Sequence, residues 1–132
     1  MAKEKVTRAK EQERLEKERR RTEAEIARLR SYLEIEMERS AGEDEDAPDA
    51  AADIYEREKT LALIRTLEDK LASIEHALRS TAVGSYGICE RCGERIDPAR
   101  LEIMPHTSLC VRCQSELERR AQPRRQLPVE GE

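Results

Sequence analysis

The chain has 132 residues and a formal net charge of −4, with 41% charged residues, 2% aromatic residues and neither Trp nor Phe. Such a length suits one ordinary domain, but a composition rich in charged residues, Ala and Leu is typical of long helices and coiled coils and argues against a compact aromatic core. The negative total also disfavours non-specific attraction of the whole chain to nucleic acid.

The N-terminal segment, residues 1–6, is charged and lacks the apolar run of a signal peptide. No segment of the sequence approaches the length and hydropathy of a membrane span. We therefore expect a cytoplasmic protein with no membrane association. In a protein without an export signal, four cysteines are more plausible as metal ligands than as two disulfides.

Residues 3–40 contain neither Gly nor Pro and carry 12 basic against 10 acidic side chains, which predicts one long helix. Four apolar residues step by three, four and four along one face of it: Ile26, Leu29, Leu33 and Met37. Upstream, Val6 and Leu15 are the only sizeable aliphatic residues. We expect the first two dozen residues to bury little and to project or fray.

The stretch that follows this helix reads SAGEDEDAPDAAAD, from Ser40 to Asp53, and holds six carboxylates and no basic residue. Gly42 and Pro48 are helix breakers within it. Taken alone, such a stretch is a solvated acidic turn. Between two helices it becomes the tip of a hairpin, at residues 41–53.

A second helix is predicted over residues 53–80, with Asp53 as its N-cap and Glu56 completing an approximate capping box. Its apolar residues are spaced close to a heptad seam: Leu61, Ile64, Leu67, Leu71, Ile74 and Leu78. Two helices with single apolar stripes and a short connection favour an antiparallel hairpin within one chain. An intermolecular coiled coil would use the same stripes, but we expect a monomer.

After residue 80 the pattern changes, since Gly84 and Gly87 break the helix and short segments around turns follow. A brief helix is predicted over residues 115–121 and a disordered tail over residues 122–132. The predicted fold is therefore mainly α: a long antiparallel helical hairpin (coiled coil), a small four-cysteine zinc-finger domain and a short C-terminal helix. The hairpin occupies residues 1–81, and the finger with its helix occupies residues 82–121.

Four cysteines form two Cys-x-x-Cys pairs separated by 17 residues: Cys89, Cys92, Cys110 and Cys113. Each pair points two thiolates the same way from one tight turn, and Gly93 can supply the positive φ that such a turn needs. Two such turns provide four sulfurs for a tetrahedral zinc ion at about 2.3 Å. The spacing predicts one structural Zn²⁺.

Other roles for the cysteines and histidines have less support in the sequence. A dithiol redox catalyst normally lies in a βαβ unit, which the sequence lacks, and a catalytic zinc needs an open position that four cysteines close. His106 could replace one ligand, whereas His76 is expected to be a packed or solvated helix residue. No nucleophile motif or Gly-rich phosphate loop is present, so we expect no enzyme activity.

The finger segment has a small set of apolar residues with which to form a core: Ile88, Ile96, Leu101, Ile103, Leu109 and Val111. Such a core is too small to fold firmly alone, and zinc can contribute roughly 10 kcal/mol or more to folding. We therefore expect a chelator to melt this end of the protein while most of the helical signal remains.

The order of helical hairpin, acidic tip and four-cysteine finger resembles the DksA/TraR family of bacterial transcription regulators. The most specific stretch is YGICERCG at residues 86–93, followed by Arg100-Leu-Glu, Pro105 and LCVRC at residues 109–113. The resemblance implies a protein that binds RNA polymerase and inserts its hairpin into the secondary channel. There the tip approaches the catalytic magnesium ion and alters the lifetime of promoter complexes.

The functional tip of this family has the pattern Asp-x-x-Asp-x-Ala. In an ungapped register from the first zinc cysteine, the pattern falls on Asp46, Asp49 and Ala51, which the resemblance implies are the tip residues. Several such proteins bind the alarmone ppGpp through basic residues of the second helix and finger. The same register places Ser73, Met104 and Gln114 there, so a response to ppGpp through that site is doubtful.

Two other functions use the same sequence. A coiled-coil adaptor would dock its zinc-ribbon end on some other protein. A nucleic-acid-binding zinc ribbon would use the arginines of the finger, yet residues 82–116 carry four basic against five acidic side chains and almost no stacking aromatics. We therefore expect no sequence-specific DNA binding.

Overall fold

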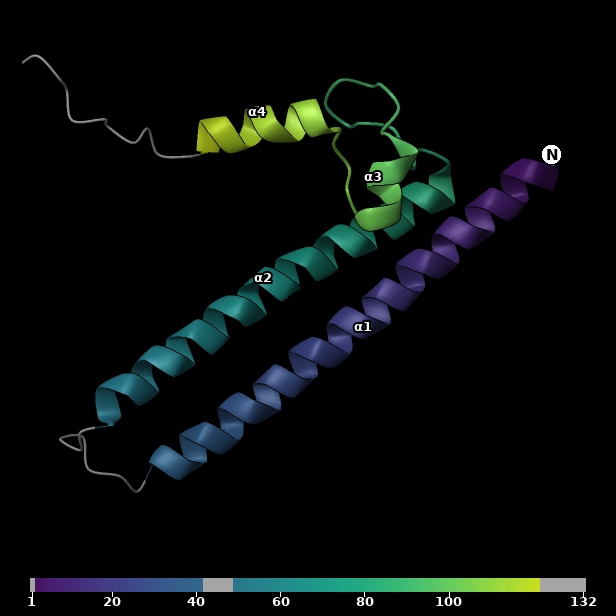
Figure 1. Ribbon diagram of the computed structural model, residues 1–132. Coiled ribbons are helices and arrows are strands. Elements are labelled where there is room, and N and C mark those ends of the chain that lie inside the picture. Colours follow the sequence, from purple (N-terminus) through teal and green to yellow (C-terminus); the bar gives the residue numbers. More distant parts are fainter. Residues whose placement is uncertain (1, 42–48, 122–132) are drawn as a thin grey trace, which may run out of the picture.

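The structure, a computed structural model, describes residues 2–41 and 49–121, with side chains described from residue 8 onward (Figure 1). Within these residues, four helices follow one another: α1 (Ala2–Ser40), α2 (Ala50–Val83), α3 (Pro98–Ile103) and α4 (Val111–Ala121). Outside the helices, an isolated antiparallel bridge joins Ile88 and Arg95. The predicted mainly α fold is confirmed.

The two long helices lie side by side and run in opposite directions (Figure 1). They have 39 and 34 residues, so that α2 alone extends about 51 Å at 1.5 Å per residue. The apolar stripe of α1 is thus covered by α2 of the same chain, which is the predicted hairpin. α3 and α4 belong to the finger at the end of the hairpin remote from residues 41–49 (Figure 1).

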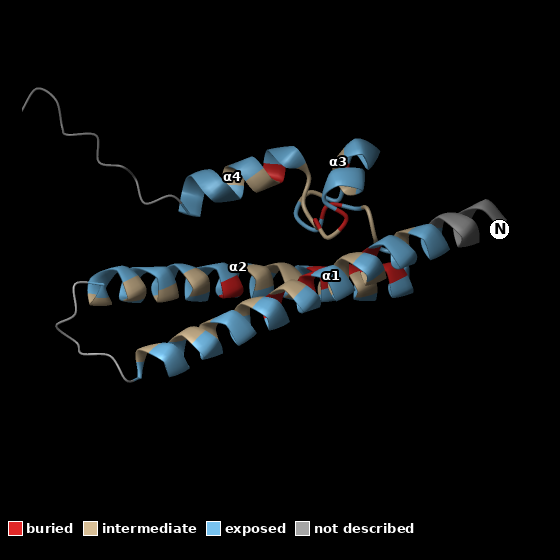
Figure 2. Ribbon diagram, turned by 60° about the horizontal axis from the view of Figure 1, so that its bottom comes forward, coloured by how far each residue is buried: buried red, intermediate tan, exposed pale blue. Residues whose placement is uncertain are grey.

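Most of the predicted seam residues are buried or half-buried. Figure 2 shows that the buried residues of the two long helices are few and lie among exposed and half-buried ones. Ile26, Ile64 and Ile74 are buried, because each points across at the partner helix. The prediction was wrong for Met37 and Leu61, which are 54% and 42% exposed. Five further seam residues are half-buried, as expected at the edge of a two-helix seam: Leu29, Leu33, Leu67, Leu71 and Leu78.

A polar contact joins the two helices near the tip. Counting back one heptad from Ile64, the seam position is held by Arg57, and its guanidinium donates a hydrogen bond to the Ser40 hydroxyl at 2.5 Å. The heptad pattern of apolar residues therefore stops before the end of the hairpin, which the sequence prediction did not foresee.

At the base of the hairpin, the structure differs from a second prediction. Leu15 has no exposed surface and packs against Ile74 and Ala77, with Leu78 and Tyr86 beside them. The expectation that the first two dozen residues bury little was wrong, because α2 and the segment after it supply apolar partners that the local sequence of α1 does not reveal.

The helix ends also differ from prediction. The N-cap of α2 is Asp49, four residues before the predicted cap Asp53, whose own N–H already bonds to the Asp49 carbonyl at 2.9 Å. The proposed capping box with Glu56 was therefore wrong. At the other end, Gly84 takes a left-handed conformation (φ 82°) and caps the carbonyls of Ser80 and Thr81, a conformation that costs glycine little.

The finger helices were only partly foreseen. α4 begins at Val111, four residues before the predicted start. α3 was not predicted, although Asp97 accepts a hydrogen bond from the Ala99 N–H and Pro98 occupies the first turn. An N-cap followed by Pro is a helix-start signal, but six residues are too few to show a period. None of the described helices has an apolar stretch long enough to cross a membrane.

Candidate metal centre and hairpin tip

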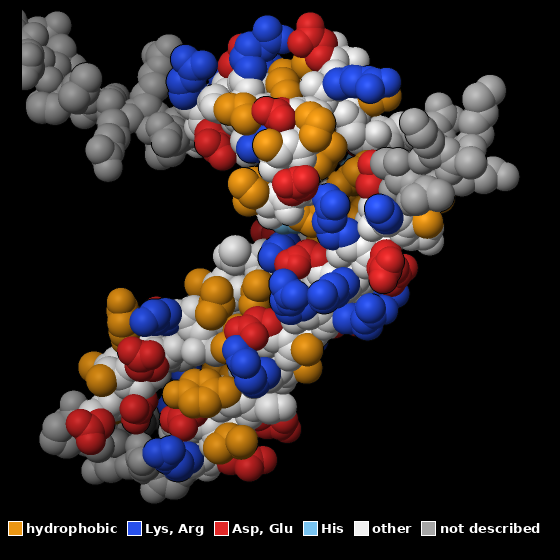
Figure 3. Space-filling view, turned by 45° about the vertical axis from the view of Figure 1, so that its right-hand side comes forward, with side chains coloured by type: hydrophobic (Ala, Val, Ile, Leu, Met, Phe, Trp, Pro, Cys, Tyr) orange, Lys and Arg blue, Asp and Glu red, His pale blue; other side chains and the backbone are white. Residues whose placement is uncertain are grey.

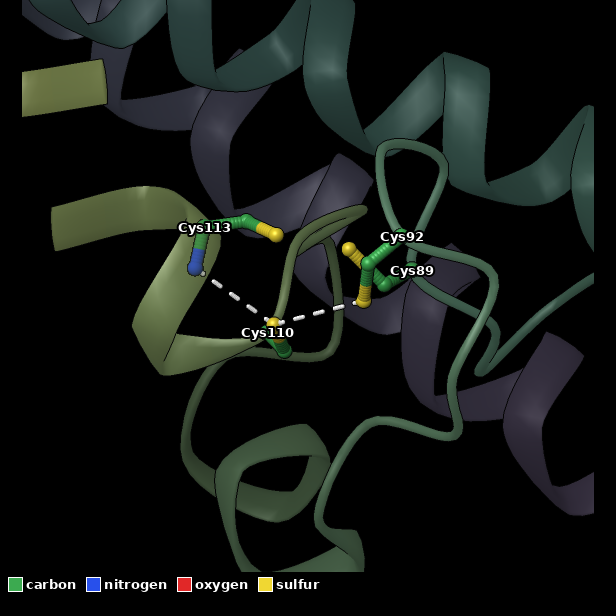
Figure 4. Close-up of side chains that lie close together, drawn as sticks. All are labelled: Cys89, Cys92, Cys110 and Cys113. Carbon is green, nitrogen blue, oxygen red and sulfur yellow. Dashed lines mark hydrogen bonds between the residues drawn. The ribbon is translucent and has the colours of Figure 1, made fainter. Parts of the chain in front are cut away.

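The four cysteines predicted as ligands converge in the finger (Figure 4). Their sulfur atoms all lie within 4.8 Å of one another, and the Sγ atoms of Cys92 and Cys110 are 3.9 Å apart. A tetrahedron of sulfurs at 2.3 Å from zinc has edges of about 3.8 Å. The cluster therefore fits one structural zinc ion with a closed coordination shell.

The first cysteine pair is held by a tight turn. The Cys89 N–H donates to the Glu94 carbonyl at 2.8 Å, and the Gly93 N–H donates to the Cys89 carbonyl at 2.9 Å. Gly93 has φ 78°, which confirms the predicted positive φ. This conformation would strain a residue with a Cβ, so glycine at this position lets the chain reverse directly after the second ligand.

The second pair lies where a loop becomes a helix. Cys110 directly precedes α4 and Cys113 lies in its first turn. The Cys113 N–H points back at the Cys110 sulfur at 3.5 Å. Three-residue spacing at a helix start places both sulfurs on the same side, which explains why α4 begins earlier than predicted: the ligand spacing is itself helical.

The electrostatics of the cluster favour a cation. Burial acts to raise the pKa of Cys89, but hydrogen bonds from the backbone N–H groups of Cys110, Cys92 and Arg91 outweigh it and lower the pKa to about 6. Burial and the neighbouring cysteines raise the pKa of Cys113 to about 12. The Cys89 thiol therefore ionises more readily than a free cysteine, and the Cys113 thiol less readily. All four sulfurs become thiolates together only when a metal ion is bound.

The finger core is built around the ligands. Cys89, Ile96 and Cys113 are its buried residues, with Leu101 and Leu109 packed against them. The other apolar residues predicted for this core are exposed, which corrects the prediction for Ile88, Ile103 and Val111. So small an apolar set cannot stabilise the segment alone, which is consistent with a fold that depends on the metal ion.

The two histidines are not among the clustered ligands. His106 is half-buried, and its Nδ1 has no hydrogen-bond partner among the described residues. Burial lowers its pKa, with further lowering by Lys70 and Arg100 and an opposing effect of Glu18. His76 is half-exposed, and its Nε2 meets the carboxylate of Glu90 in the finger, a contact that its helix position alone could not reveal.

Sequence reasoning also missed structural contacts made by two residues of the finger motif. Tyr86 packs on the core around Leu15 and donates its hydroxyl to the Pro105 carbonyl at 2.8 Å. Arg100 on α3 donates its Nε to the Leu109 carbonyl at 3.1 Å. These residues belong to the motif of the finger, so the motif carries structural contacts as well as ligands.

Comparisons with known proteins agree with this architecture. Residues 84–119 match the family model described as the prokaryotic dksA/traR C4-type zinc finger. The structure of the transcription factor DksA2 from Pseudomonas aeruginosa superposes with a TM-score of 0.72 at 26% identity, covering 87% of this chain and 85% of that one. The chain belongs to the DksA/TraR family.

Two relatives of this DksA/TraR chain extend the match beyond the finger. An uncharacterized protein of Aquifex aeolicus is 38% identical over 96 residues, which cover 69% of this chain and 66% of the relative. The RNA polymerase-binding transcription factor DksA of Caulobacter vibrioides is 37% identical over 90 residues, covering 68% and 61%. The chain thus matches slightly less than two thirds of the length of each relative.

The tip residues that the resemblance implies are described only in part. Asp49 is exposed at the start of α2, and its side chain makes no capping hydrogen bond. Ala51 is exposed in the first turn of the helix. Asp46 lies outside the described residues. The structure thus places two of the three implied residues at the end of the hairpin, in water.

Near the finger, a cavity of about 420 Å³ separates α2 from α3 and α4. Its lining includes the three residues at the positions where the resemblance implies basic side chains: Ser73, Met104 and Gln114. Arg100 also lines it, but donates hydrogen bonds to the Leu109 carbonyl and, at 3.4 Å, to the Thr107 hydroxyl.

Proposed function

We propose that this protein is a bacterial transcription regulator that binds RNA polymerase directly, inserts its hairpin tip into the secondary channel and modulates initiation. The observation that carries this proposal is the uncapped, exposed carboxylate of Asp49 at the end of a narrow two-helix arm. From Ala50 to the core residue Ala77 the arm extends about 40 Å. The Caulobacter relative is an RNA polymerase-binding transcription factor, and this similarity supports the choice of partner.

The chemistry of the tip fits such a role. A carboxylate at a helix start normally accepts a backbone hydrogen bond, but that of Asp49 makes no capping bond within the part of the chain that the structure describes. Its acceptor oxygens can therefore bind another molecule. Delivered into a narrow channel, it can accept hydrogen bonds from basic groups or alter the field around a bound metal ion. The small side chain of Ala51 permits close approach of the backbone.

A substitution of Asp49 by Asn tests the tip. It keeps the shape and removes the charge, so we expect open-complex lifetime with the cognate polymerase to lose most of its response while polymerase binding is reduced less. Asp53→Asn is the matched control, because Asp53 lies one turn further along α2 and outside the tip pattern. Equal transcription by both variants and the unaltered protein would rule out the tip assignment.

Site-specific cross-linking from position 49 tests the partner. A photoreactive residue at this position should form adducts with the largest polymerase subunits near the active site, whereas one at Arg79, close to the finger, should label a different region. Adducts with an unrelated protein, and none with polymerase, would instead support the adaptor function that the fold also permits.

The cavity between α2 and the finger supports a regulator that does not respond to ppGpp through this site. Phosphate groups are bound by cationic side chains with free hydrogen-bond donors. Ser73, Met104 and Gln114 carry no positive charge, so they do not provide such donors. Titration of ppGpp into the protein–polymerase complex should show no binding beyond that of polymerase alone. The monomeric state, the cytoplasmic location and the lack of enzyme activity stay predictions.

A further inference from the structure

The exposed apolar side chains of the two long helices are concentrated at one level of the hairpin. Within residues 8–31 and 64–82, every large apolar side chain is buried or half-buried. Nearer the turn, seven large apolar side chains are 42–64% exposed: Tyr32, Ile35, Met37, Ile54, Tyr55, Leu61 and Leu63. We call these seven residues the apolar collar. Single apolar residues scattered over a surface are ordinary, whereas a cluster of them marks an interaction surface.

The α1 half and the α2 half of the collar lie at the same level, because contacts between the helices fix their register. Arg57 donates a hydrogen bond to the Ser40 hydroxyl, and Arg30 forms an ion pair with Glu68 at 3.2 Å. The collar residues of α1 lie between Arg30 and Ser40. Those of α2 lie between the partners of these two residues or within one turn of Arg57. The two halves therefore form one band across the arm.

The collar has members on both outer faces of the arm. Ile35 follows the buried Ile26 by nine residues, and Tyr55 precedes the buried Ile64 by nine residues. At 100° per residue, a spacing of nine places two side chains on opposite sides of a helix. Because Ile26 and Ile64 point into the seam, Ile35 and Tyr55 point outward, in opposite directions from the arm.

The two edges of the seam are apolar as well. Leu61 and Leu63 lie about 60° and 100° from Ile64, on opposite sides of it. Beside Tyr32, a cavity of about 80 Å³ opens between the helices and is also lined by Glu56 of α2. The collar thus presents apolar side chains all round the arm. A flat partner covers one face only, whereas a partner that encloses the arm contacts every face.

The charge of this end of the hairpin narrows the class of partner. Residues 32–63 hold 11 carboxylates and three basic side chains, a formal charge of −8 in a chain whose total is −4. Figure 3 shows hydrophobic and acidic side chains together over this end, whereas Lys and Arg side chains gather over the middle of the hairpin, below the finger. Like charges oppose association, which disfavours both nucleic acid and a second copy joined collar to collar. A protein surface with basic groups among apolar ones is complementary.

We propose that the apolar collar is the surface through which RNA polymerase holds the hairpin arm, with apolar side chains and basic groups of the channel wall contacting it from all sides. Aromatic residues and Met are enriched in protein interfaces, and the collar holds two Tyr and one Met. This contact supplies much of the binding affinity, while Asp49 at the tip supplies the effect on transcription. This division of roles rests on the function proposed above.

Substitutions on opposite sides of the arm test whether the partner encloses it. Ile35→Ala and Tyr55→Ala each remove one outward side chain and leave the seam intact, and a double variant combines them. Val83→Ala with Ile103→Ala is the matched control, because these two residues are still more exposed but lie outside the collar. Affinity of each zinc-loaded full chain for the cognate polymerase is measured by titration, and open-complex lifetime is measured at saturating protein.

We expect each single variant to weaken polymerase binding about fivefold and the double variant about 25-fold, which is typical of side chains that contribute to an interface. At saturation the double variant should still change open-complex lifetime fully, whereas Asp49→Asn should bind and change it little. The control should bind like the unaltered protein. A loss in only one single variant would indicate a partner on one face and overturn the enclosing contact. Equal losses in the double variant and the control would overturn the role of the collar.

Failure of the collar and failure of the proposed function give different results. Tight binding by the double variant, together with loss of the effect in Asp49→Asn, would overturn the collar and leave the function standing. Absence of polymerase binding by the unaltered protein would overturn both. Sedimentation at the concentrations of the titration tests the remaining occupant: a dimer that the double variant dissociates would identify a second copy and overturn the proposal.

Discussion

Leu15 is fully buried although charged residues surround it along α1. Its partners Ile74 and Tyr86 come from elements about 60 and 70 positions later. One aliphatic side chain thus fixes the N-terminal part of α1 to the base of the hairpin, at the place where the finger begins. Stability at this end rests on a few such residues, because most of the helix surface is polar.

Replacing Leu15 by Ala should therefore be costly. Truncation of a fully buried Leu removes about 2–5 kcal/mol from the free energy of unfolding, and the shortened side chain would leave a cavity against Ile74. Urea unfolding, followed by circular dichroism at 222 nm, measures the loss. Ile35→Ala is the control, because Ile35 is 60% exposed and surface changes are usually within about 0.5 kcal/mol. Equal losses would contradict the assignment of Leu15 to the core.

At the scale of elements, the hairpin and the finger are stabilised differently. The hairpin has two long helices packed along a seam, whereas the finger has two short helices, tight turns and an apolar cluster of three buried residues, two of which are metal ligands. Cooperative folding of so small an element needs a contribution beyond apolar burial. The four sulfurs provide it when they bind a metal ion.

Removal of zinc should therefore unfold the finger and spare the hairpin. A strong chelator is expected to abolish protection of finger amides from hydrogen exchange, while most of the 222 nm ellipticity remains, since α1 and α2 have 39 and 34 residues against 6 and 11 in α3 and α4. Cys113→Ser should reproduce the effect without chelator. Loss of the hairpin signal at the same chelator concentration would show that the two elements fold as one unit.

The sequence predicted these elements where the signal is periodic or fixed by spacing. The heptad seam around Ile64 and Ile74 repeats at a regular interval along the sequence. The two cysteine pairs likewise have a fixed spacing, so both features can be recognised without a structure. The start of α2 was misplaced because several acidic residues near the turn could each act as a cap. The burial of Leu15 depends on distant partners on α2 and at Tyr86, and the contact of His76 with Glu90 depends on the finger folding back on α2. Local patterns encode neither.

At the scale of the whole molecule, the finger is held on the hairpin by contacts with both long helices. His106 lies in this contact: its charged neighbours are Lys70 and Glu18 of the hairpin and Arg100 of the finger. Lys70 and Glu18 form an ion pair across the two helices at 3.6 Å. A second positive charge from the histidine is disfavoured there, since burial and two cations oppose it.

This arrangement should make attachment of the finger sensitive to acid. Because the pKa of His106 in the folded protein lies below its ordinary value of 6.5, the unfolded chain binds more protons than the folded one as pH falls through 6.5, and folding stability decreases with falling pH. His106→Gln removes this contribution. The variant should therefore lose less stability than the unaltered protein between pH 7.5 and 5.5.

Urea unfolding in excess zinc at several pH values measures the difference, and acid release of the metal ion affects both proteins alike. His76→Gln is the matched control, because His76 belongs to the hairpin side of the junction and meets the carboxylate of Glu90 rather than the Lys70–Glu18 pair. Parallel profiles for the unaltered protein and His106→Gln would show that His106 contributes nothing to the pH dependence. A steeper loss of stability with falling pH in the His106→Gln variant would contradict the prediction, because it would mean that the charged imidazole stabilises the folded state.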